Sequence, residues 1–327
     1  MNILAREKET VCVVVVTYNR KQLLLECLGS LQRQSYPLDA IYLIDNASTD
    51  GTDRLLGEIG YIKILPPENL TQPWEEKNEI KNLSNGENIK IHYIRMHKNT
   101  GGAGGFYEGT KRGHEAGFDN IWLMDDDVLC DVDALRQLMT AKTESAICAC
   151  ARYEKLTGKL ANGGECIKVN FSNPFKPLHY RKIQSLDLID RKEPLEIESA
   201  TFEAVLIHRS IIDRIGYPDP NYFIYGDDTD YTYRASLAGI HILMFPKAKI
   251  VRLNANMSVS RMTHYFMVRN MILLDLKYGN FLVKMLRPLR LYWTPIRILL
   301  RYGDLRYAFS MMSAIFDGYL TYLKHWL

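Results

Sequence analysis

The chain has 327 residues, of which 47% are hydrophobic and 24% are charged, and its formal net charge is +3. These values are typical of a globular protein with a sizeable core and exclude an intrinsically disordered chain. The sequence has no run of 18 apolar residues that would span a membrane, and its charged start, MNILAREKET, does not resemble a secretory signal. Six scattered cysteines form no metal-binding pattern, so we expect them to be reduced and buried in a cytoplasmic protein without a nucleic-acid partner.

Apolar runs alternate with helical patterns through the first 125 residues. Strands are expected within 11–20, 40–52, 89–95 and 121–124, and helices over 21–34 and from the glycine-rich segment to about 117. This alternation predicts an α/β fold with a mostly parallel sheet covered by helices on both faces. The polar, proline-containing stretch 66–88 is expected to be an inserted loop.

The second half of the chain is less regular. A strand is expected at 200–208, followed by a short helix and an acidic segment at 225–234. The last 65 or so residues read as basic amphipathic helices: residues 261–327 carry a balance of +7, against −4 for the remainder. We therefore expect a catalytic domain over 1–255, with halves of about 10–130 and 131–255, and a helical region over 256–327.

Polar residues and glycines follow four of the expected strands. They are Thr17 to Arg20, Asp45 and Asn46, Asn99 to Gly105, and Asp125 to Asp127. Ligands of an open α/β sheet bind at the carboxyl ends of its strands. These residues are therefore expected to converge on one ligand site.

Three aspartates stand in a row directly after the buried run IWLM. Adjacent carboxylates that stay ionised need a counter-charge, and a hard divalent cation such as Mg²⁺ or Mn²⁺ supplies one. Asp125 and Asp127 are thus candidate ligands for a metal that bridges a diphosphate. The structural alternative is an acidic helix start, since Asp131 and Asp133 follow.

Four glycines, at 101, 102, 104 and 105, open the expected helix after the third strand. They complete neither GxGxxG nor a P-loop, but they permit a ligand to approach the backbone closely at a helix start. A tight strand-to-helix turn is the alternative.

A second acidic group comprises Asp227, Asp228 and Asp230. Asp230 is expected to pair with Arg234 four residues later along a helix. Asp227 or Asp228 is then free to act as a general base, which attack by an alcohol on a sugar carbon requires. Two helix-capping acids are the alternative.

Five motifs, VVVVTYNR, LIDNASTDGT, NTGGAGGF, WLMDDDV and YGDDTDYTYR, follow one another in this order. Together they resemble family 2 glycosyltransferases of the GT-A fold over about residues 10–255. The pairing of GGAGGF with a triple aspartate is most similar to galactofuranosyltransferases, and next to rhamnosyltransferases.

The resemblance implies an inverting transfer from a nucleotide sugar, with Asp228 as the base beside Asp227. The implied metal ligands are Asp125 and Asp127, for Mn²⁺ or Mg²⁺. The implied nucleotide-sugar contacts are Thr17, Arg20, Asp45 (to the base), Asn46, Asn99, Gly101, Gly102, Gly104, Gly105 and Asp126 (to ribose or donor sugar). The donor is expected to be UDP-galactofuranose, or alternatively dTDP-rhamnose, and the acceptor a glycan or lipid-linked glycan.

The sequence departs from galactofuranosyltransferases at the third metal ligand, which is usually a histidine. The corresponding stretch, AKIVRLNANMS, contains none. Asn254, Asn256 and the more distant His264 stay open as alternatives.

The basic C-terminal region suits an interface, since apolar stretches alternate there with Lys and Arg around Trp293. We expect it to dock the enzyme on the cytoplasmic face of the cell membrane. Ordinary packing against the catalytic domain or against a second copy is the alternative.

Two other classes of function fit part of the pattern. IWLMDDDV and GDDTD resemble motifs of haloacid-dehalogenase-type phosphatases, although the first of these motifs normally ends the first strand of that fold. A sugar-nucleotide-binding module without activity is the other alternative, but both acidic groups are intact.

Overall fold

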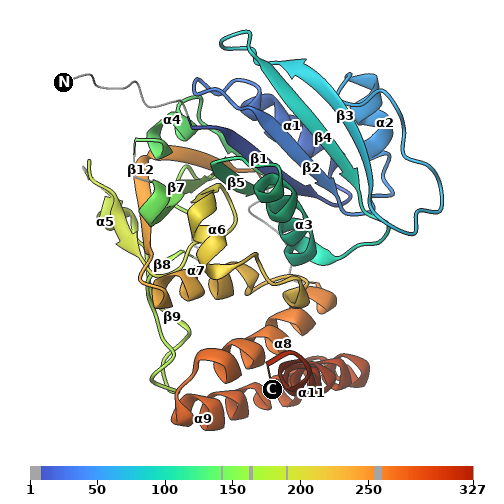
Figure 1. The fold of residues 1–327 in the computed structure, drawn as a ribbon. Coiled ribbons are helices and arrows are strands. Elements are labelled where there is room, and N and C mark those ends of the chain that lie inside the picture. Colours follow the sequence, from blue (N-terminus) through green and yellow to red (C-terminus); the bar gives the residue numbers. More distant parts are fainter. Residues whose placement is uncertain (1–8, 141–142, 162–164, 189–190, 254–259, 327) are drawn as a thin grey trace.

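A ten-stranded sheet forms the centre of the computed structural model, which describes residues 9–140, 143–161, 165–188, 191–253 and 260–326 (Figure 1). Its strand order is β10-β12-β7-β11-β5-β1-β2-β4-β3, with β6 paired to β12. Six strands run in one direction: β1 (Val11–Thr17), β2 (Ala40–Asp45), β4 (Asn88–Arg95), β5 (Asn120–Asp125), β7 (Ala146–Glu154) and β12 (His241–Arg252). The predicted mostly parallel α/β sheet is confirmed.

Strand β1 lies at the centre, and all seven of its residues are buried. Its β-branched side chains alternate between two apolar cores, one on each face of the sheet. One face is covered by α1 (Lys21–Leu31), α2 (Thr52–Glu58) and α4 (Ala134–Leu138), and the other by α3 (Gly101–Glu115), α6 (Arg209–Ile215) and α7 (Asp227–Leu237). The sheet is therefore the middle layer of three.

Helix α3 approaches β1 closely because glycines line the face that meets the strand. An added Cβ would lie 2.5 Å from a Val16 methyl carbon at Gly105 and 2.2 Å from a Val14 methyl carbon at Gly109. Real Cβ contacts are not that short, so this helix–strand spacing requires glycine.

Of the four antiparallel strands described in this sheet, only β11 was expected. They are β3 (Trp74–Lys81), β6 (Val128–Cys130), β10 (Leu195–Ile197) and β11 (Val205–His208). The prediction of a loop throughout 66–88 is wrong, because β3 pairs with β4 along the sheet edge. Its sequence, WEEKNEIK, is mostly charged, which suits a half-exposed edge strand but hides the apolar alternation.

Short elements complete the region between β7 and α7. They are the helical turns η1 (Thr143–Ser145) and η2 (Pro220–Tyr222), the hairpin β8 (Cys166–Val169) with β9 (His179–Lys182), and α5 (Ser185–Leu188). All six cysteines are free and buried, as predicted.

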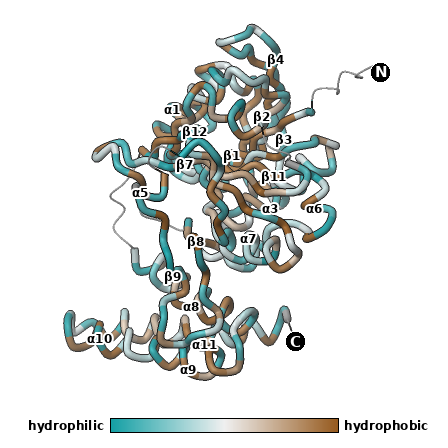
Figure 2. The backbone as a smooth tube through the Cα atoms, turned by 90° about the vertical axis from the view of Figure 1, so that its left-hand side faces the viewer, coloured by the Kyte–Doolittle hydropathy of each residue, from teal (hydrophilic) through white to brown (hydrophobic). Residues whose placement is uncertain are grey.

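Four C-terminal helices form a layer at one end of the molecule, beside α7 (Figures 1 and 2). They are α8 (Arg261–Tyr278), α9 (Phe281–Leu291), α10 (Trp293–Tyr302) and α11 (Leu305–Trp326). Helix α8 packs on both sides: Leu273 joins a core with Tyr222 and Phe171, while Ile272 joins one with Met311. No helix in the described part of the chain is long and apolar enough to cross a membrane. The expected domain boundary at 255 lies outside the described residues.

Candidate functional site

Strand register brings the predicted residues to one edge of the sheet. Thr17 at the end of β1 is level with Asp45 at the end of β2, and the preceding residue of β1 is level with Asp125. Asp45 is in turn level with Arg95 at the end of β4. The convergence expected from the strand ends is therefore present.

The triple aspartate is tied directly to the first motif. Thr17 Oγ1 donates a hydrogen bond to Asp126 Oδ2 at 2.6 Å. The Arg20 guanidinium lies 3.2 Å from Asp126 Oδ1 and 3.4 Å from Asp127 Oδ2. Asp126 and Asp127 are both buried. These four predicted residues thus form one polar cluster.

The electrostatics of this cluster favour a bound cation. Burial raises the pKa of Asp125 well above its usual value, and the negative charge of Asp127 raises that pKa further. Burial also raises the pKa of Asp126 to about 6, although Arg20 opposes the shift. Asp127 Oδ1 is buried without a hydrogen-bond partner among the residues described. Carboxylate oxygens in this state are suitable ligands for Mg²⁺ or Mn²⁺.

Further charged residues lie beside the aspartates; Glu203 was expected only near the acceptor, and Arg252 and Arg152 were not predicted. Arg252, the last residue of β12, places Nε 4.0 Å from Asp127 Oδ2 and Nη1 3.8 Å from Glu203 Oε1. Glu203 also accepts a 2.6 Å hydrogen bond from the buried Arg152. Arg252 belongs to AKIVRLNANMS, the stretch expected to hold the third metal ligand, and a cationic side chain is not a metal ligand.

The three residues considered as a third metal ligand do not settle that position. Asn254 and Asn256 lie outside the described residues. His264 is on α8, where its Nδ1 is 2.6 Å from the hydroxyl of Tyr307 on α11. Its ring therefore takes part in packing between C-terminal helices.

Asp45 is fully buried, and its carboxylate is already engaged. Oδ2 accepts hydrogen bonds from the Tyr93 hydroxyl at 2.7 Å and from Arg95 at 2.6 Å, and Oδ1 accepts one from the Ser48 amide at 2.8 Å. An open pocket of about 680 Å³ lies beside it. The lining residues include Ser48, Thr49, Arg95, Lys21 and Asp50. Ser48 and Arg95 thus separate the Asp45 carboxylate from this pocket.

The glycine loop is held mainly by its own neighbours. Asn46 Nδ2 donates to the Gly101 carbonyl oxygen at 2.7 Å, and Asn99 Oδ1 accepts from the Gly101 amide at 2.8 Å. Gly101 has φ +73°, and a Cβ there would lie 2.0 Å from a backbone oxygen of the segment before α7. At Gly104 it would lie 2.4 Å from Thr100 Oγ1.

Only one glycine of the loop faces open space. A Cβ at Gly102 would meet nothing within 4 Å, whereas Gly101, Gly104 and Gly105 each have a packing reason. Gly102 is therefore the loop position at which a ligand can approach the backbone.

The second acidic group begins α7. Burial raises the pKa of Asp227 well above its usual value, and the charge of Asp228 adds to this. Burial raises the pKa of Asp228 to about 6, although a 2.6 Å hydrogen bond from the Thr229 amide opposes the shift. The predicted pairing of Asp230 with Arg234 is confirmed at 2.9 Å.

Tyr225 precedes α7 and lies near both acidic groups. It is partly exposed, burial raises the pKa of its hydroxyl, and the charges acting on that pKa include those of Arg252, Asp125 and Asp228. The Tyr225 hydroxyl therefore lies near both acidic groups.

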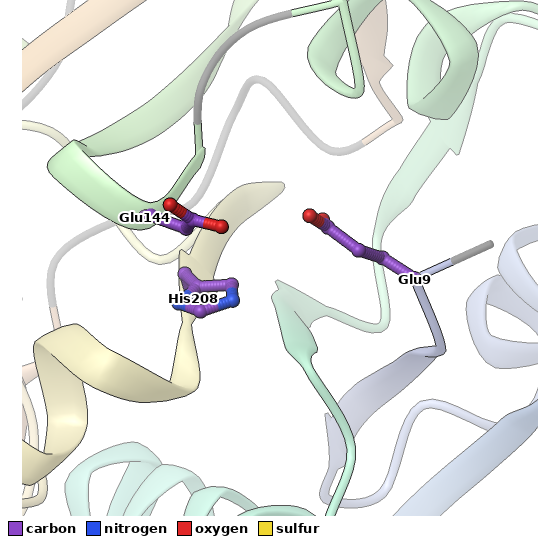
Figure 3. Close-up of side chains that lie close together, drawn as sticks. All are labelled: Glu9, Glu144 and His208. Carbon is purple, nitrogen blue, oxygen red and sulfur yellow. The ribbon is translucent and has the colours of Figure 1, made fainter. Parts of the chain in front are cut away.

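A separate group of three side chains, two acids and a histidine, is drawn in Figure 3. Potential ligand atoms of Glu9, Glu144 and His208 lie within 4.8 Å of one another. Glu9 precedes β1, and His208 is paired with Asn120 at the start of β5. This group is thus remote from the strand ends that carry the predicted site.

Two models of known protein families match this chain. The model of "Glycosyl transferase family 2" matches residues 12–72, and that of "Glycosyltransferase like family 2" matches residues 81–270. The chain belongs to glycosyltransferase family 2. The phosphatase alternative is therefore wrong.

Curated relatives include the galactofuranosyltransferases GlfT1 of Mycolicibacterium smegmatis and Mycobacterium tuberculosis. The first is 24% identical over 244 residues, which cover 71% of this chain and 67% of the relative. The second is 25% identical over 235 residues, covering 71% and 66%. The glycosyltransferase thus spans about two thirds of the length of these relatives.

Solved structures share the GT-A fold. GalNAc-T7 with UDP, GalNAc and Mn²⁺ aligns with a TM-score of 0.56 and 16% identity, over 97% of this chain and 57% of that one. The mannosyltransferase PcManGT from Pyrobaculum calidifontis, with GDP-Man and Mn²⁺, aligns with a TM-score of 0.53 and 14% identity, over 97% and 88%. The predicted fold is confirmed.

Proposed function

We propose that this glycosyltransferase moves galactofuranose from UDP-galactofuranose to a hydroxyl of a lipid-linked or polysaccharide acceptor, with inversion. The observation that carries the proposal is that the charges of Asp125 and Asp228 both act on the Tyr225 hydroxyl, so members of both acidic groups lie near this one side chain. The galactofuranosyltransferase relatives support this choice of donor. The products are UDP and a new glycan linkage.

Asp228 is the proposed general base. A pKa of about 6 leaves its carboxylate ionised near neutral pH and still basic enough to take a proton from a hydroxyl as attack proceeds. The acceptor oxygen forms a bond to the anomeric carbon, and the bond from that carbon to the diphosphate breaks. The electron pair of the broken bond stays on the diphosphate oxygen. One displacement of this kind inverts the anomeric centre.

Asp125 and Asp127 are the proposed ligands of Mn²⁺ or Mg²⁺. A divalent cation there would neutralise charge that develops on the diphosphate leaving group. The unpartnered, buried Oδ1 of Asp127 supports this assignment. Arg20 and Arg252, which flank Asp127, provide additional positive charge for the diphosphate.

The nucleotide is proposed to extend from Asp126 towards the pocket beside Asp45. Thr17 holds Asp126 in place for the ribose or donor sugar. Ser48 and Arg95 line the pocket, so they are the groups that meet the base, and Asp45 orients both. Gly102 offers its backbone to the diphosphate.

The outer face of the C-terminal layer is proposed to bind the cytoplasmic face of the membrane. Phe281, Trp293 and Leu300 are 75%, 63% and 81% exposed on α9 and α10, with Arg297 and Arg301 among them. Apolar and basic side chains mixed in this way suit an anionic leaflet, where each cation contributes about 1 kcal/mol. The enzyme would then be peripheral and close to a lipid-linked acceptor. Contact with a second copy is the alternative occupant.

Calorimetry of UDP, dTDP and GDP, each with and without Mn²⁺, tests the donor and metal assignments together. We expect UDP to bind only with metal, and to lose this binding in Asp125→Ala. Asp133→Ala is the matched control, since Asp133 is an exposed acid eight residues later. A preference for dTDP would favour dTDP-rhamnose as donor. Failure of all three nucleotides to bind with metal would overturn the proposal.

A further inference from the structure

The backbone immediately before α7 adopts a strained turn. Phe223 has φ 63° and ψ −62°, and the amide of Ile224 donates to the carbonyl oxygen of Tyr222 at 2.8 Å. These features define a γ-turn of the rare positive-φ form. Tyr225 follows with φ 66° and Gly226 with φ 89°. Strained segments of this kind persist only where the surrounding structure holds them.

Asn270 of α8 is hydrogen-bonded to this turn. Its side chain is 2% exposed, and Nδ2 donates to the carbonyl oxygens of Tyr222 at 2.9 Å, Ile224 at 2.8 Å and Tyr225 at 2.5 Å. Its Oδ1 accepts a 2.8 Å hydrogen bond from Arg269. Both polar atoms of this buried amide are thus hydrogen-bonded. Nδ2 contacts three carbonyl oxygens of the turn, and Oδ1 contacts Arg269.

The preceding residue and a ring from the same helix add to this support. Arg269 Nη2 donates to the Asn221 carbonyl oxygen at 2.5 Å and to that of Tyr222 at 2.9 Å. The ring of Phe223 stacks on Phe266, with centroids 4.5 Å apart and planes 20° apart. Phe266, Arg269 and Asn270 of α8 therefore contact the turn along its whole length.

The turn also touches the donor side of the site. The carbonyl oxygen of Phe223 accepts a 3.0 Å hydrogen bond from the Ala103 amide at the start of α3. Gly101 leaves just enough room for this oxygen. Movement of the turn would consequently shift the glycine loop and the aspartates that begin α7 relative to each other.

We propose that Asn270 is a positioning residue, which sets the distance between the general base and the donor by fixing this turn. The proposal rests on the role of Asp228 proposed above. Leucine has a similar size but no donor, and aspartate would place a negative acceptor against three carbonyl oxygens. The two N–H groups of the asparagine amide are shared among these three oxygens, whereas neither leucine nor aspartate has a donor to offer them.

Hydrogen exchange and kinetics of Asn270→Leu test the proposal. Asn280→Ala is the matched control: Asn280 caps α9 in the same layer and bonds Ser172 and Val283, away from the turn. We expect amides within 222–230 to exchange at least 10-fold faster in Asn270→Leu than in the control. With UDP-galactofuranose, kcat for UDP release should fall at least 10-fold, with the KM for the donor unchanged. Exchange and kcat equal to those of the control would overturn the proposal.

A second variant and a separate readout keep the test decisive. Asn270→Ser retains one donor, so if Asn270→Leu does not fold, the serine variant should show the same changes in smaller measure. Wild-type protein that releases no UDP would refute the proposed donor, whereas the exchange of 222–230 would still decide whether Asn270 fixes the turn. Unchanged exchange in Asn270→Ser would count against the positioning role.

Discussion

Asp228→Asn separates a catalytic base from a helix-capping acid, because the two roles predict opposite changes in stability. A capping carboxylate favours the start of α7, so its removal would lower the free energy of unfolding by about 0.3–1 kcal/mol. A buried base is costly to ionise in the folded state, so its removal should raise that free energy. The amide keeps Oδ1 as an acceptor for the Thr229 amide.

The expected increase in the free energy of unfolding of Asp228→Asn follows from the pKa of Asp228. Its folded value of about 6 exceeds the ordinary 3.8, so between these pH values the folded state binds more protons than the unfolded one. Stability then falls as pH rises through this window, and the full cost is present above pH 6. A pKa about two above the ordinary value corresponds to about 3 kcal/mol in the free energy of unfolding. This is an upper value, because solvent screens a residue that is partly exposed. For a chain of this length that is a rise in Tm of about 4 °C.

Differential scanning calorimetry between pH 4 and pH 8, combined with a UDP-release assay, measures both effects. Asp228→Asn should melt higher than wild type at pH 7.5, with a difference that disappears by about pH 4. Its kcat should fall about 10²–10⁴-fold, the usual contribution of a general base. A lower Tm at pH 7.5, or a kcat equal to that of wild type, would refute the reasoning.

Three further outcomes follow from the site and the C-terminal layer. Mn²⁺ at about 100 times its Kd should stabilise wild type by about 2.7 kcal/mol, which raises the Tm by about 4 °C. Asp127→Asn should not show this rise in Tm, and an equal rise in the variant would exclude Asp127 as a ligand. Gly105→Ala should lower the free energy of unfolding in urea by about 1–3 kcal/mol, because its Cβ meets Val16. Gly102→Ala should leave that free energy unchanged and weaken UDP binding, and equal stabilities of the two variants would contradict this contrast. Leu300→Glu should reduce flotation with anionic vesicles at least 5-fold without changing Tm, and undiminished flotation would remove α10 from the docking surface.

The carboxyl-edge site was predictable because parallel strands have one direction. Once the strands ending in Thr17, Asp45 and Asp125 were recognised as parallel, their ends had to meet at one edge. Local sequence was enough, since each strand is an uninterrupted apolar run followed by a polar residue. Edge strand β3 was missed for the opposite reason, because charge dominates a strand with one exposed face.

Roles within the site were harder to predict, because they depend on partners distant in sequence. Asp45 looks like an open ligand in its motif, yet Tyr93 and Arg95, about fifty residues away, occupy its carboxylate. The glycine loop looks like a ligand cradle, yet Gly105 and Gly104 are required by packing, and Gly102 alone faces open space. A motif specifies a residue type but not which neighbour requires it.

Helix α8 bears on where the catalytic part of the chain ends. Basic, apolar sequence begins at about residue 261, so the catalytic part was expected to end near 255. The family match nevertheless continues to residue 270, which is the asparagine that holds the turn before α7. Lys277 of the same helix also lies 2.6 Å from Asp230 of α7. Both contacts join α8 to the start of α7 or to the turn before it, so we propose that the catalytic part of the chain includes α8.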